Sequence, residues 1–205
     1  MRSIVLGHSI AAGSLDPEGG WPQRLTREFT PEAVDDPWDY HNLYNLAVSG
    51  FTTEDVGKQL PEELEVRDTD EEKLVIIQIG LNDPIYDLEE GCYRVSKEEF
   101  RENLENIIET VDEFADYFYV LEEPPVNIDG KLDWEQTESL EQQDIEEYEK
   151  IKREVCKENN VVMIELRSAL PEKYRENLAD GLHPNGKGHQ MIADIVKAEI
   201  GHHYE

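Results

Sequence analysis

Five short apolar runs recur along the chain, and longer segments with helical spacing separate them. The runs cover residues 3–7, 43–48, 74–80, 117–125 and 161–166. Most of them are continuously apolar rather than alternating, which is typical of strands in a sheet that helices cover on both faces. The repeated order of strand, helix and strand predicts an α/β domain with a mainly parallel sheet.

Three of the intervening segments carry an apolar stripe at helical spacing. Residues 100–115 form the clearest stripe, and Ser96 with Glu99 matches the capping box that starts such a helix. Two further stripes cover residues 145–155 and 191–200. The chain shows no internal repeat, and its length of 205 residues lies within the range of one domain, so we expect a single domain.

Acidic residues far outnumber basic ones: 48 Asp and Glu face 19 Lys and Arg, for a formal net charge of −29. A surface of this charge repels nucleic acid and anionic lipid headgroups, so neither is expected as a partner. The acids are spread along a chain that keeps its apolar periodicity, which indicates a folded acidic surface rather than disorder. Because molar salt shortens the Debye length to about 3 Å and screens the repulsion, the composition predicts a salt-rich cytoplasm, as in halophilic organisms.

The sequence also excludes several kinds of anchor and site. No leader with charged and apolar regions precedes the first strand, and no apolar run reaches membrane-spanning length, so we expect a soluble cytoplasmic protein. Cys92 and Cys156 are too few for a disulfide framework or a thiolate metal site. The histidines have no recognised metal-ligand spacing, so we expect neither a metal nor another cofactor.

Polar residues follow three of the apolar runs, at the point where each predicted strand ends. They are His8 and Ser9 after the first run, Ser49 and Gly50 after the second, and Asn82 and Asp83 after the third. Ligands bind outside the carboxyl ends of the strands in an open parallel sheet, so we expect these groups to share one edge. Asp180 and His183 form a further polar pair just before the last predicted helix.

These residue types match the needs of ester cleavage by a serine. A serine nucleophile needs a base to take its proton, and the base needs a carboxylate to fix its tautomer. Asp180 and His183 can supply both to Ser9 from one tight turn. The attacked carbonyl becomes an oxyanion, for which the backbone N–H groups of Ser9 and Gly50 and the side-chain amide of Asn82 are suitable donors.

The chain resembles the SGNH or GDSL-type serine hydrolases in four blocks that occur in the family's order. The blocks are "GHSIAAG", "NLAVSGFTTEDV", "IGLND" and "DGLHPNGKGH". The resemblance covers essentially residues 1–205 and implies a three-layer, flavodoxin-like α/β/α sandwich that hydrolyses esters or thioesters without a metal. It implies these roles: Ser9 as nucleophile, Gly50 and Asn82 as oxyanion donors with the Ser9 N–H, and Asp180 and His183 as the rest of the triad.

One position departs from the family, which usually has aspartate directly before the nucleophile. This chain has His8 there. Because neighbouring side chains on an extended strand point to opposite sides, we expect His8 to face away from the site. The change removes a usual support for the nucleophile turn, so it is expected to affect the rate more than the chemistry.

The segments 84–95 and 124–139 are the least regular, and each follows a strand, so each is a predicted wall of the ligand site. The candidate substrate contacts are Asp83, Tyr86, Tyr93 and Trp134. The rings of Tyr93 and Trp134 are of the kind that stack on a sugar. Neither segment is a long apolar lid, which favours a short acyl chain, such as acetyl on a carbohydrate or a small alcohol.

The sequence favours a serine esterase acting on a small-molecule acyl ester, and it leaves two alternatives open. One is a binding protein that kept the fold without the chemistry, with His8 as a sign of relaxed demand on the nucleophile turn. The other is an acyltransferase or thioesterase that uses the same residues, because the acyl-enzyme is the same and only the acceptor or the leaving group differs.

Overall fold

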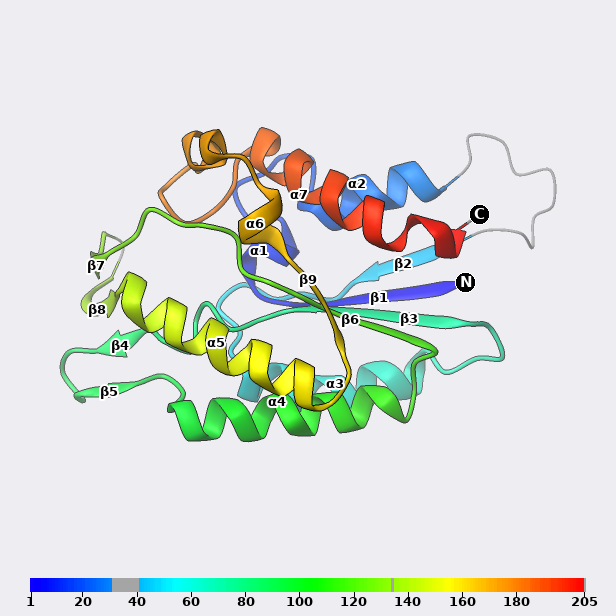
Figure 1. Cartoon of the computed structure of the whole chain (residues 1–205), viewed down its shortest axis with the longest axis horizontal. Coiled ribbons are helices and arrows are strands. Elements are labelled where there is room, and N and C mark those ends of the chain that lie inside the picture. The colour runs from blue at the N-terminus through cyan, green and yellow to red at the C-terminus, as the bar shows by residue number, and fades with distance from the viewer. Residues whose placement is uncertain (31–40, 134, 205) are drawn as a thin grey trace.

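A parallel sheet lies at the centre of the computed structural model, which describes residues 1–30, 41–133 and 135–204 (Figure 1). Its strands are β1 (Arg2–Gly7), β2 (Asn42–Asn45), β3 (Lys73–Gln78), β6 (Tyr117–Leu121) and β9 (Val162–Ile164). They lie in the order β2-β1-β3-β6-β9, and each neighbouring pair is parallel. This is the flavodoxin-like order, and each strand overlaps one of the five apolar runs, so the predicted sheet is confirmed.

Helices cover both faces of this sheet, as Figure 1 shows. One face carries α1 (Ser9–Ala12), α2 (Gly20–Phe29), α6 (Leu166–Ala169) and α7 (Gly186–Ile200). The other face carries α3 (Thr53–Val66), α4 (Lys97–Asp112) and α5 (Gln142–Glu158). The 3₁₀ turns η1 (Glu172–Asn177) and η2 (Gly201–Tyr204) flank α7. The predicted three-layer arrangement is therefore confirmed.

Alternate residues of β1 and β3 supply the two halves of the core. Val5 and Ile76 pack with Trp21 on the α2 and α7 side, whereas Leu6 and Ile77 pack toward α3, α4 and α5. All five side chains are fully buried, and burial of one such side chain contributes about 1.5–3 kcal/mol. Neighbouring strand residues point to opposite faces, so a continuously apolar strand is the sequence that serves both layers.

Helix α4 begins where the capping box predicts. The Glu99 N–H donates to Ser96 Oγ at 3.3 Å, and the Ser96 N–H donates to Glu99 Oε2 at 3.0 Å. Such a cap contributes about 1 kcal/mol by satisfying N–H groups that have no partner within the helix. The two residues thus fix the end of the segment 84–95 that forms part of the ligand cavity.

A second, antiparallel sheet corrects the expectation of irregular structure over 84–95 and 124–139. Its strands are β4 (Tyr86–Asp87), β5 (Cys92–Tyr93), β7 (Gly130–Leu132) and β8 (Glu135–Leu140), in the order β5-β4-β8-β7. β4 and β5 contain two residues each, which is too short for a period-two pattern to be visible in the sequence. The sheet forms at the carboxyl end of β3 and gives rigid support to the cavity wall.

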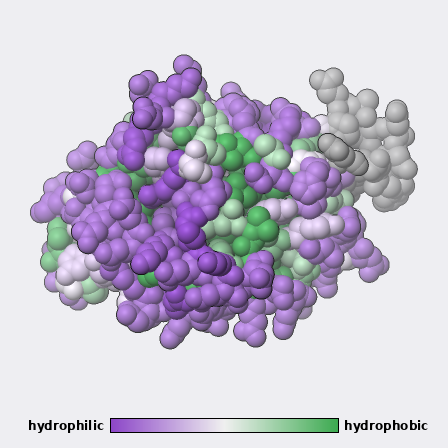
Figure 2. Space-filling view, viewed as in Figure 1, coloured by the Kyte–Doolittle hydropathy of each residue, from purple (hydrophilic) through white to green (hydrophobic). Residues whose placement is uncertain are grey.

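Hydrophilic side chains cover most of the face shown in Figure 2, and a hydrophobic strip interrupts them over β9. Val162 of β9 is 52% exposed, and β9 is an edge strand of the sheet. The only two cysteines, Cys92 and Cys156, are free thiols. Within residues 1–30, 41–133 and 135–204, no helix has both the length and the apolar character of a membrane span.

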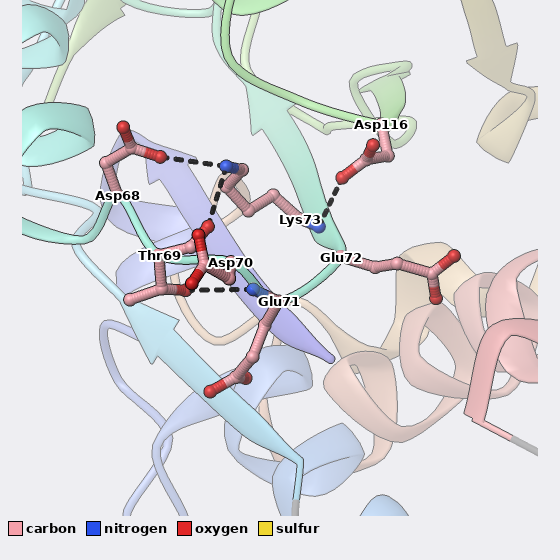
Figure 3. A pocket seen from close by; sticks show the side chains of 7 residues that line it. All are labelled: Asp68, Thr69, Asp70, Glu71, Glu72, Lys73 and Asp116. Atoms are coloured by element: carbon pink, nitrogen blue, oxygen red, sulfur yellow. Dashed lines mark hydrogen bonds and ion pairs between the residues drawn. The ribbon is translucent and has the colours of Figure 1, made fainter.

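An acidic hollow of about 490 Å³ lies at the amino end of β3 (Figure 3). Its one cation, the Lys73 ammonium, donates to Asp68 Oδ1 at 2.8 Å and to the Thr69 carbonyl at 3.0 Å. The Lys73 N–H donates to Asp116 Oδ2 at 2.8 Å. The described part of the chain contains no group of three or more His, Cys, Asp or Glu side chains arranged to hold a metal ion. The acids of the hollow therefore serve to hold Lys73 and the start of β3, and we assign no ligand to it.

Candidate active site

A cavity of about 390 Å³ opens at the carboxyl edge of the parallel sheet. The five residues predicted to act on an ester all line it: Ser9, Gly50, Asn82, Asp180 and His183. They come from four separate segments of the chain, which the parallel topology brings to one edge.

Ser9 is the first residue of α1 and follows β1 through a turn that requires glycine at Gly7. Gly7 has φ 148°, and a Cβ there would lie 2.0 Å from the Gln78 carbonyl oxygen of β3. Only a residue without a side chain therefore fits at this position. Gly13, with φ 80°, ends α1 four residues after Ser9. The short helix holds Ser9 at the cavity with 7% of its surface exposed.

Hydrogen bonds connect Ser9, His183 and Asp180 in one line. His183 Nε2 lies 2.8 Å from Ser9 Oγ, and His183 Nδ1 lies 2.7 Å from Asp180 Oδ2. An ionised Asp180 only accepts hydrogen bonds, so the ring hydrogen of His183 is on Nδ1. The unprotonated Nε2 then accepts a hydrogen bond from the serine hydroxyl. This is the tautomer that can take a proton from Ser9.

The turn that carries Asp180 and His183 is built by Asp180 itself. Its Oδ1 accepts from the backbone N–H of Leu182 at 3.0 Å and of His183 at 2.7 Å. Burial raises the pKa of Asp180, but the hydrogen bonds from the backbone and the ring of His183 outweigh it and hold the pKa below its usual value. Asp180 therefore stays ionised at neutral pH and orients the imidazole.

The three residues predicted to supply oxyanion donors, Ser9, Gly50 and Asn82, line the cavity together. Asn82 Nδ2 donates to the Phe51 carbonyl at 2.8 Å, which fixes the plane of its amide. Gly50 has φ 87°, a left-handed conformation that favours glycine. Among the described residues, the backbone N–H groups of Ser9 and Gly50 have no hydrogen-bond acceptor. Donors without a partner at the end of a cavity are what a developing oxyanion requires.

His8 faces away from the cavity, as predicted, and is fully buried. However, the loss of support for the turn is not observed. The Ile10 N–H donates to His8 Nδ1 at 3.3 Å, so the imidazole caps α1 in the way that an aspartate would. His8 Nε2 lies 2.9 Å from Glu123 Oε1 on the opposite side.

Asp83 does not line the cavity, which corrects the prediction that it contacts substrate. Its side chain is fully buried, and Oδ1 accepts from the Thr53 N–H at 2.9 Å and the Thr53 hydroxyl at 2.5 Å. Burial raises the pKa of Asp83 to about 6. The residue after Asn82 points away from the site and ties the first turn of α3 to the end of β3.

Tyr86 and Tyr93 also lie outside the cavity, and this corrects two further predicted contacts. Their rings meet edge to face at 5.2 Å across β4 and β5. The Tyr93 hydroxyl donates to Asp144 Oδ1 at 2.7 Å, and this bond raises its pKa to about 12. The two rings join β4 to β5, and Tyr93 also ties the small sheet to α5. The fourth predicted contact, Trp134, lies outside the described residues.

The predicted wall segments do reach the cavity, through other residues. They contribute Ile85, Arg94 and Leu132, and Leu140, Leu182 and Leu15 add to the apolar side. Arg94 is held in place by Glu138, which accepts from its Nη2 at 2.8 Å. Leu132 and Leu140 reach the cavity through the pairing of β7 with β8. A strand as short as β7 has no periodic pattern in the sequence from which the contact could be predicted.

The sequence model of the GDSL-like lipase/acylhydrolase family matches residues 5–191. The chain belongs to this family. Among solved structures similar to this GDSL-like protein is the lipase/acylhydrolase from Enterococcus faecalis, at 27% identity and a TM-score of 0.72, covering 99% of this chain and 97% of that one.

Two further structures share the fold at lower identity. The acetylxylan esterase Axe2 from Geobacillus stearothermophilus is 23% identical, with a TM-score of 0.71, and covers 98% of this chain and 94% of that one. LAE5, an α/β hydrolase enzyme from the metagenome of Lake Arreo, Spain, is 19% identical, with a TM-score of 0.69 and the same coverage. No curated protein matches this family member significantly.

Proposed function

We propose that this protein is a serine esterase that cleaves a small acyl ester through an acyl-enzyme. The proposal rests on the continuous hydrogen bonds from Ser9 Oγ through His183 to Asp180, at the end of a cavity that also holds N–H donors. A binding protein would have no use for an imidazole that accepts from a serine hydroxyl.

In this mechanism Ser9 Oγ attacks the ester carbonyl while His183 Nε2 takes the hydroxyl proton. The N–H groups of Ser9 and Gly50 and the Asn82 amide hold the oxyanion of the tetrahedral intermediate. His183 then gives its proton to the leaving alcohol, and the acyl group stays on Ser9. A water molecule attacks this acyl-enzyme by the same steps, with His183 as its base, and releases the acid. Asp180 stabilises the imidazolium formed in each half-reaction.

Asn82→Ala is expected to lower kcat by about 10²–10³-fold with little change in KM, because the amide binds the oxyanion more strongly than the ground-state carbonyl. Steady-state kinetics on nitrophenyl acetate measure this. The matched control is Asn103→Ala. Asn103 is on α4, outside the cavity, and its amide donates to Thr53 Oγ1 of α3. Unchanged kcat in folded Asn82→Ala would assign the oxyanion hole to other donors.

The acyl group is proposed to be short. The apolar side of the cavity consists of a few buried side chains, including Ile85, Leu132 and Leu140. In the described structure no long apolar helix extends this surface over the cavity. On nitrophenyl esters from acetate to dodecanoate, we expect kcat/KM to be highest for acetate or butyrate. A maximum at dodecanoate would contradict a short-chain site. Acetylated xylo-oligosaccharides belong in the same series, because acetylxylan esterases share the fold.

A further inference from the structure

A network of buried polar side chains lies directly behind the nucleophile turn and takes no part in the mechanism above. His8, Gln78, Glu123 and Lys152 are fully buried, and Glu149 is 5% exposed. They come from the ends of β1, β3 and β6 and from α5. Charged groups are costly to bury, so such a cluster persists where its members pair with one another.

The hydrogen bonds of His8 define where its ring hydrogen lies. The Ile10 N–H donates to Nδ1 at 3.3 Å, so Nδ1 is an acceptor and carries no hydrogen. Nε2 must then carry it and donates to Glu123 Oε1 at 2.9 Å. His8 is therefore a neutral imidazole that accepts on one side and donates on the other. An imidazolium would place a second N–H against that of Ile10, and the cap would be lost.

The groups that face His8 hold its Nε2 in place. Glu123 supplies the acceptor: burial raises its pKa, but its hydrogen bond with His8 and the charge of Lys152 more than offset this and hold the pKa below its usual value. The Lys152 ammonium lies 3.6 Å from Glu123 Oε1 and 2.5 Å from Glu149 Oε1 on α5, and donates to the Ile79 carbonyl at 2.9 Å. This cation balances the negative charge of the two buried carboxylates.

Asp83 and Arg167 complete the charges around His8. Asp83 lies on the β3 side of His8, and its carboxylate is bonded to Thr53. The Arg167 Nε of α6 donates to the Glu123 carbonyl at 3.2 Å. Gln78 donates to Glu123 Oε2 at 3.5 Å and accepts from the indole of Trp21 at 2.8 Å. Both oxygens of the Glu123 carboxylate therefore have polar partners: His8 and Lys152 at Oε1, and Gln78 at Oε2.

We propose that His8 is a positioning residue for the nucleophile. As a neutral imidazole that Glu123 holds in place, it caps the Ile10 N–H and fixes the peptides on either side of Ser9. Those peptides set both the direction of Ser9 Oγ and the direction of the Ser9 N–H toward the oxyanion. This role rests on the esterase function proposed above, since it concerns the same serine. A displacement of about 1 Å at a reacting group can cost 10²-fold in rate.

A pair of variants separates the cap from the packing. His8→Asn and His8→Leu both remove the ring and the donor to Glu123, but only the asparagine oxygen can accept from the Ile10 N–H. We expect His8→Asn to keep kcat within about tenfold of the wild type and His8→Leu to lose about 10²-fold, with KM changed less than kcat in both. Equal kcat in the two folded variants, whether high or low, would overturn the proposal.

The tautomer gives a test that does not depend on activity. In ¹⁵N spectra of the wild-type protein at neutral pH, His8 is expected to show an unprotonated Nδ1 and a protonated Nε2, with the signals assigned by their absence in His8→Asn. A protonated Nδ1 would contradict the cap. If the wild type hydrolyses no ester but shows this tautomer, the esterase function fails while the capping geometry stands, so the two failures are distinguishable.

Discussion

Ser9→Ala is expected to lower kcat on nitrophenyl acetate by about 10⁵–10⁶-fold, because without the hydroxyl only binding and the oxyanion donors contribute to the rate. The same change is expected to abolish labelling by a fluorophosphonate probe, which reacts with a serine that a base has activated. Mass spectrometry of the wild type, in molar salt that screens the net charge of −29, should place the adduct on Ser9.

Ser14→Ala is the matched control for this experiment. Ser14 lines the same cavity, but its hydroxyl lies 2.8 Å from that of Ser49, which is not a base that can activate it. The control should keep both activity and labelling. Labelling that persists in Ser9→Ala would place the nucleophile elsewhere. A folded wild type that is neither labelled nor active would favour a binding protein on this fold.

The main sheet and its helices could be predicted because their sequence signals are long. β3 lies in a seven-residue run in which every residue but Gln78 is apolar or small, and α4 has both a stripe and a capping box, so each element is defined by several residues at once. The small sheet carries no such signal. Tyr86 and Tyr93 are paired only because β8 and α5 pack beside them, and those contacts span about fifty residues of sequence.

The cavity residues could be predicted to the extent that topology decides their place. Ser9 and Asn82 follow parallel strands directly, so the sheet brings both to one edge whatever the details of the turns. The direction of a side chain within a turn is a local matter that topology does not decide. Asp83 is next to Asn82 in sequence and yet bonds to Thr53 behind the site.

The role of His8 also could not be predicted from the sequence. From the sequence alone, its replacement of the usual aspartate is a loss, because nothing nearby can hold an imidazole in a capping position. The residue that does so is Glu123, 115 positions later, at the end of β6. The contact that holds His8 in its capping position therefore joins two distant parts of the sequence, and it becomes visible only when the fold brings them together.

Asp180→Asn is expected to lower kcat by about 10⁴-fold in a folded protein. The amide has one oxygen, whereas both carboxylate oxygens of Asp180 accept hydrogen bonds: Oδ1 from the backbone of Leu182 and His183, and Oδ2 from the His183 ring. If the amide oxygen stays with the backbone, its NH₂ faces Nδ1 and selects the tautomer that cannot accept from Ser9. If the amide turns, its NH₂ meets two backbone N–H groups and the turn opens.

Asp87→Asn distinguishes these effects from a general cost of replacing aspartate in a turn. Asp87 Oδ1 accepts from the backbone N–H groups of Glu89 at 2.8 Å and Glu90 at 2.9 Å, which is the same arrangement as in Asp180 but without a histidine. Kinetics and thermal unfolding of both variants decide between the possibilities. A small loss of stability in both, with kcat lowered only in Asp180→Asn, is the expected result. Wild-type kcat in a folded Asp180→Asn would mean that His183 keeps its productive tautomer without a carboxylate, and the role proposed for Asp180 would be wrong.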